Sequence, residues 1–72
     1  MQKFIYLVKY TAVVDYEEFD AIIVIAIDKA EAEEIALKEC RNFTPETIKT
    51  IVIGKANKDK NCGVVLASFN AG

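Results

Sequence analysis

The sequence contains no histidine and no tryptophan, and it has only one proline, three glycines and two cysteines in 72 residues. Without histidine, Ser-His-Asp and Cys-His catalysis are excluded, and so are histidine-containing zinc sites. Cys40 and Cys62 stand far apart and form no CxxC pair, so we expect two free thiols rather than a metal knuckle or a redox motif. A chain of this length is one domain, residues 1–72.

Long apolar runs and a strong excess of one charge are also missing. The longest apolar run, residues 21–27, is far shorter than the ~20 residues that span a bilayer. Eleven acidic and nine basic side chains leave a net charge of −2, which argues against attraction to nucleic acid or to an anionic membrane. We therefore expect a soluble, cytoplasmic protein with neither membrane nor nucleic acid as a partner.

Apolar residues make up 53% of the chain, and their spacing predicts four strands and one helix. Four segments are rich in β-branched and aromatic residues and are predicted as strands: 3–14, 19–27, 47–56 and 64–69. The short polar break at 15–18 predicts a hairpin between the first two, and NKDKNCG at 57–63 predicts a turn between the last two.

The helix is predicted from residue 29 to about residue 42. Asp28 is a suitable N-cap, and Glu31 stands three residues later, as in a capping box. Thr44 and Pro45 end the helical pattern. One apolar stripe recurs at helical spacing: Ala32, Ile35, Ala36, Cys40 and Phe43.

These elements predict an α+β fold of order β-β-α-β-β. We expect a four-stranded antiparallel sheet of strand order 2-1-3-4, with the helix on one face. The first two strands are apolar on both faces, whereas a sheet with one wet face should alternate apolar and polar residues. One helix covers one face, and so small a domain tolerates little exposed apolar surface. The sequence therefore predicts a homodimer or higher oligomer, packed sheet to sheet or edge to edge. The alternative is that the tail and long side chains cover the second face.

Two charged segments are candidate sites. The acidic tip of the first hairpin is a candidate partner-binding edge or, alternatively, a solvated turn; its members are Asp15, Tyr16, Glu17, Glu18 and Asp20. Its spacing lacks the glycine and the terminal glutamate of a calcium loop, so no metal is expected. Nothing near it suggests the concave setting that acid–base catalysis by paired carboxylates needs.

The second candidate is the basic loop of Lys55, Lys58 and Lys60, which carries no Walker pattern but has lysines that can contact phosphates. Tyr6 and Tyr10 are candidates for stacking on the base of such a nucleotide. For the lysines the alternative is a solvated hairpin loop, and for the tyrosines it is packing in the core or in a dimer interface.

The segment YLVKYTAVVDYEEFDAIIVIAIDKAEAEEIALKE, with the closing LASFNAG, resembles small uncharacterised proteins of bacteriophages and prophages. The pattern is similar to that of phage counter-defence proteins, which implies a small, oligomeric, non-enzymatic protein without a cofactor. The first function expected is binding and inhibition of a host defence protein. The alternatives are sequestration of a small signalling nucleotide and a structural or assembly role in a virion.

Overall fold

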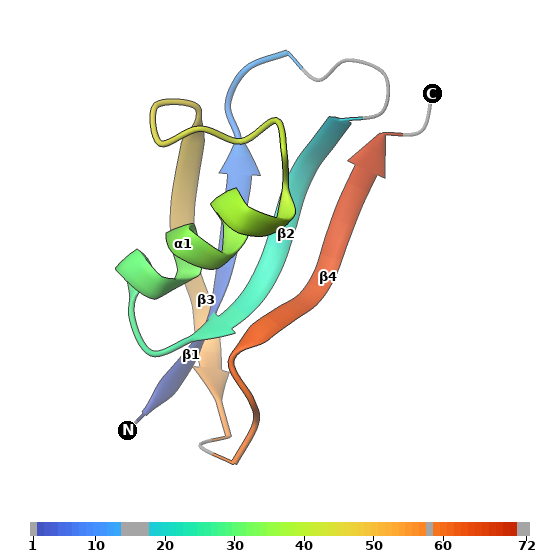
Figure 1. Cartoon of the computed structure of the whole chain (residues 1–72). Helices are drawn as coiled ribbons and strands as arrows, with labels where there is room; N and C mark the ends of the chain where they lie inside the picture. The colour runs from blue at the N-terminus through green and yellow to red at the C-terminus, as the bar shows by residue number, and fades with distance from the viewer. Residues whose placement is uncertain (1, 14–17, 58, 71–72) are drawn as a thin grey trace.

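The computed structural model describes residues 2–13, 18–57 and 59–70, without the side chains of residues 69 and 70. It contains a four-stranded antiparallel open sheet and one helix (Figure 1). The elements follow one another along the chain: β1 (Lys3–Tyr10), β2 (Glu18–Ala26), α1 (Lys29–Glu39), β3 (Ile48–Ala56) and β4 (Gly63–Asn70). In this part of the chain, no helix has the length and apolar character needed to cross a membrane.

The strand order is β3-β1-β2-β4, so the expected order 2-1-3-4 is wrong in the position of the last strand. After β3 the chain does not turn back to pair with it. It passes the ends of β1 and β2 and enters β4 at the far edge of the sheet, against β2 (Figure 1). The side-chain Nζ of Lys3 donates a hydrogen bond to the backbone carbonyl of Lys60 in this passage. The observed order places β1 and β2, whose residues are apolar on both faces, in the two central positions where edge exposure is least.

The helix begins as the sequence predicts. The Asp28 carboxylate accepts a hydrogen bond from the Glu31 backbone N–H at 2.8 Å, and the Glu31 carboxylate accepts one from the Ile27 N–H at 3.0 Å. The helix ends at Glu39, earlier than the predicted residue 42. Asn42 explains the difference, because its side-chain amide donates to the Phe19 carbonyl and accepts from the Phe19 N–H, both at 2.9 Å. This long-range pairing with β2 replaces the last turn of helix.

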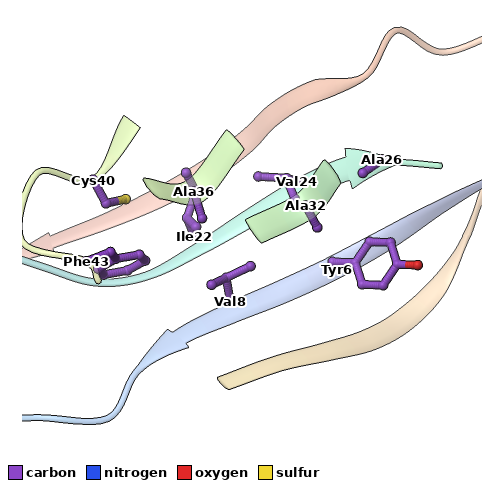
Figure 2. Packing of buried hydrophobic residues seen from close by; sticks show 9 residues of the cluster. All are labelled: Tyr6, Val8, Ile22, Val24, Ala26, Ala32, Ala36, Cys40 and Phe43. Atoms are coloured by element: carbon purple, nitrogen blue, oxygen red, sulfur yellow. The ribbon is translucent and has the colours of Figure 1, made fainter. Parts of the chain in front are cut away.

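The core lies between α1 and one face of the sheet (Figure 2). It is built from nine buried residues: Tyr6, Val8, Ile22, Val24, Ala26, Ala32, Ala36, Cys40 and Phe43. Ile35 packs against this cluster from the helix. The predicted apolar stripe of the helix is therefore confirmed. We call the face of the sheet that carries this core the helix face.

Three β-bulges shift the register of the sheet. The unpaired extra residues are Asp20 in β2, Ile53 in β3 and Val65 in β4. A bulge inserts one residue and changes which later residues point to a given face. In β3 and β4, the two edge strands, the residues on one side of the bulge therefore point to the opposite face from the one that strict alternation would predict.

Candidate functional site

The face of the sheet opposite the core carries aliphatic side chains from all four strands. Since Tyr6 and Val8 of β1 point into the core, the alternate residues of β1 point to the other face, and their partners across the strands share it. Among the described residues, no helix or strand packs on this face. We call it the open face.

An unbroken line of four aliphatic side chains crosses the open face from edge to edge. Leu7 of β1 lies opposite Ile51 of β3 and opposite Ile23 of β2, and Ile23 lies opposite Leu66 of β4. The two central side chains are half-buried by their neighbours, whereas Ile51 is 39% exposed and Leu66 is 61% exposed. We call Ile51, Leu7, Ile23 and Leu66 the aliphatic row.

A second row lies beside the first. Ile5 of β1 is opposite Gly54 of β3 and Ile25 of β2, and Ile25 is opposite Gly63 of β4. We call Gly54, Ile5, Ile25 and Gly63 the glycine row. It has side chains in the middle and none at its two edges, while the aliphatic row has large side chains in all four positions.

Beyond the aliphatic row the open face becomes cationic. Lys9 of β1 and Lys49 of β3 lie directly opposite one another, and both are exposed. Like charges in such a pair repel, so these ammonium groups extend into solvent. Ala21 and Ser68 complete this end of the face.

The acidic tip is described only in part. Asp15, Tyr16 and Glu17 lie outside the described residues. Glu18 is half-buried as the first residue of β2, and Asp20 is the exposed bulge residue. The partner-binding role of these five residues stays a prediction.

The basic loop gains one member that the sequence did not suggest. Lys55 and Lys60 are exposed at one end of the sheet, and Lys3 joins them through its hydrogen bond to the Lys60 carbonyl. Lys58 lies outside the described residues. The surface formed by residues 2–13, 18–57 and 59–70 has no pocket in which these lysines would surround a ligand.

Tyr6 and Tyr10 are used for packing. Tyr6 belongs to the buried core and is 8% exposed. The ring of Tyr10 stacks on that of Phe43, with centroids 5.6 Å apart and planes 4° from parallel. The ring of Tyr6 is therefore not available to stack on a base, whereas Tyr10 is half-buried and its base-stacking role stays a prediction.

Neither thiol is set up as a nucleophile. Both cysteines are free. Burial, with the Glu39 charge adding to it, raises the pKa of Cys40 to about 11. A hydrogen bond to Glu31 is the main cause that raises the pKa of the exposed Cys62. A raised pKa keeps a thiol protonated at neutral pH and hence unreactive. Within the described residues, no three ligating side chains (His, Cys, Asp or Glu) lie close enough together to hold a metal ion.

Comparison with known proteins gives no relative: no protein-family model, no curated protein and no solved structure matches the chain. The resemblance to phage proteins finds no support in this comparison. The two rows of the open face are therefore the basis for a functional proposal, and the sequence alone did not reveal them. The signal for the face itself, apolar residues on both sides of the first two strands, was visible in the sequence.

Proposed function

We propose that this protein is a non-catalytic, homo-oligomeric binding protein whose open face is its contact surface. The observation that carries the proposal is the aliphatic row, four adjacent side chains that span every strand of the sheet without a covering element in the described chain. Isolated exposed apolar residues are ordinary on protein surfaces, but a contiguous apolar patch is typical of an interaction site.

The dimensions of the sheet suit a small protein interface. Four strands of about eight residues cover roughly 19 Å by 26 Å, or about 500 Å² in plane, at ordinary strand spacing and rise. Side-chain relief raises the accessible area above that value. A stable interface of standard size uses about 800 Å² on each partner, so most of the open face has to take part.

The setting of the thiols and the shape of the surface also favour contact over chemistry. Cys40 is buried, and a hydrogen bond to Glu31 raises the pKa of Cys62, so neither thiol is activated as a nucleophile. Catalysis needs a concave site that excludes water and aligns reacting groups. The open face is the surface of a sheet, and its main feature is the aliphatic row.

Two neighbouring residues of β3 give the experiment a matched control. Ile51 points to the open face and is 39% exposed, whereas Val52 lies opposite Tyr6 on the helix face and is 55% exposed. Ile51→Lys and Val52→Lys therefore place the same charge on the same strand, on opposite faces. We expect Ile51→Lys to raise the dissociation constant of the oligomer at least ten-fold in sedimentation equilibrium, and Val52→Lys to change it less than three-fold.

The edge-to-edge alternative has its own variant. Val64 of β4 lies opposite Val24 on the helix face and is 44% exposed. If subunits pair through the free edge of β4, Val64→Lys weakens the oligomer and Ile51→Lys does not. That result, or equal effects of Ile51→Lys and Val52→Lys, contradicts the proposal. Circular dichroism of each variant shows whether the fold is retained.

A further inference from the structure

We infer that the open face binds a second copy of the chain in one register, with the aliphatic row of each copy over the glycine row of the other. This inference rests on the proposed function, because it names the partner and the contacts of the same surface. The structure supplies two observations for it: the complementary shape of the two rows, and a glycine within β3 where the single chain leaves room for a side-chain Cβ.

The shapes of the rows are complementary at the edges of the sheet. The aliphatic row ends in Ile51 on β3 and in Leu66 on β4, and the glycine row ends in Gly54 and Gly63 on the same two strands. Consider a two-fold axis that lies between two facing sheets, perpendicular to the strands and midway between the rows. It carries each row onto the other and keeps β3 facing β3.

In that arrangement, Ile51 of one copy sits over Gly54 of the second copy, and Leu66 sits over Gly63 of the second copy. The central pairs place Leu7 over Ile5 and Ile23 over Ile25. Large side chains thus face empty edge positions, and aliphatic side chains meet in the middle. A two-fold interface of this kind is self-complementary and closes at two subunits.

Gly54 provides the second observation. It lies within β3, where a glycine costs stability because it adds backbone entropy to the unfolded chain and packs no side chain. Positive φ is found at Gly63, with φ 146°, and not at Gly54. A Cβ added at Gly54 would meet the Cδ1 atom of Ile5 at 3.8 Å, which is ordinary contact distance.

Neither a positive φ nor crowding of a Cβ within the chain requires a glycine at position 54. Glycine in a strand marks a bulge or close approach by another molecule, and Gly54 directly follows the bulge residue Ile53. The second copy's Ile51 supplies that approach in the inferred register. Gly63 is different, because its positive φ explains the glycine without any partner.

Gly54→Val tests the register sharply. Valine is a strong strand former and its Cβ would stand at ordinary contact distance from Ile5 Cδ1 in the single chain, so we expect the variant to fold and the monomer to be about as stable as the unmodified one. In the dimer its side chain takes the place of the second copy's Ile51, and we expect the dissociation constant to rise at least ten-fold in sedimentation equilibrium. Ile51→Ala in the same chain makes room, so the double variant should recover most of the affinity lost in Gly54→Val.

A cross-linking experiment gives an answer even if Gly54→Val fails to fold. Cys62→Ser removes the exposed thiol, and Ile51→Cys and Gly54→Cys are then made in separate chains. In the inferred register, an oxidised mixture forms a disulfide between the two chains faster than either variant does with itself.

The outcomes distinguish the two proposals. If the unmodified protein is monomeric, the proposed function fails together with this inference. If Ile51→Lys disrupts the dimer while Gly54→Val leaves it intact, or if the mixed disulfide forms no faster than the self-linked ones, the register is wrong and the proposed function stands.

Discussion

The central strands carry aliphatic side chains on both faces of the sheet, but α1 covers only the helix face. On the helix face, Val8, Ile22 and Val24 are at most 1% exposed beneath α1. On the open face, Leu7 and Ile23 are their direct sequence neighbours, equally aliphatic but only half-buried. Aliphatic side chains on a strand therefore do not show by themselves which face is the core. The single helix decides that, and it leaves the second face available for a contact between molecules.

The largest effect expected from this comparison comes from two neighbouring residues of β2. Ile22→Ala removes a fully buried side chain and should lower the free energy of unfolding by about 2–5 kcal/mol. Ile23→Ala, on the open face, should cost the monomer less, because Ile23 is already partly in water. Urea unfolding at a concentration low enough to keep the protein monomeric measures both. Equal losses would mean that the open face is covered by the chain itself.

The pH dependence of stability tests whether Cys40 is buried on the helix face. Burial raises the pKa of Cys40 from 9.0 to about 11, so the folded state holds its thiol proton more tightly than the unfolded state does. The resulting stability is present in full below pH 9 and is lost as pH rises toward 11. Cys40→Ala removes this contribution, and the difference in unfolding free energy between the two proteins should therefore shrink across that window. A difference that stays constant between pH 8 and pH 11 would show that Cys40 is not buried.

A smaller effect is expected where the helix begins. Asp28→Ala removes the acceptor for the Glu31 N–H and should cost about 1 kcal/mol of stability. Asp28→Asn keeps an acceptor oxygen and should cost little. Because this cap lies outside the open face, thermal unfolding should change with Asp28→Ala while the dissociation constant of the oligomer stays the same. If Asp28→Ala also raised the dissociation constant of the oligomer, the helix would be part of the interface, and the assignment of contact to the open face alone would be wrong.

Local features of the fold were predictable from the sequence, and long-range ones were not. The N-cap at Asp28 and the apolar stripe of the helix depend on residues within a few positions of one another, and both are confirmed. The end of the helix was predicted too late because Asn42 pairs with Phe19, which is distant in sequence. The position of β4 was wrong for a related reason. Consecutive strands usually pair, but here β4 lies against β2 at the other edge of the sheet.

The same limit applies to the candidate site. The presence of a second apolar face followed from the lack of apolar–polar alternation in the first two strands, so a contact surface was expected. The two rows were beyond prediction, because they depend on the strand order and on the extra residues Ile53 and Val65. Without those bulges, Gly54 and Gly63 would not fall beside Ile5 and Ile25. The charged candidates, by contrast, were easy to see in the sequence, but the contact that the structure shows within the described part of the basic loop is the hydrogen bond from Lys3 to the Lys60 carbonyl.

The most direct test of the contact function of the open face is the mass of the unmodified protein in solution, measured by sedimentation equilibrium over a hundred-fold range of concentration. The account predicts a reversible dimer that Ile51→Lys dissociates and Val52→Lys preserves. A chain that stays monomeric over the whole range, or a dimer that is indifferent to Ile51→Lys, would contradict it.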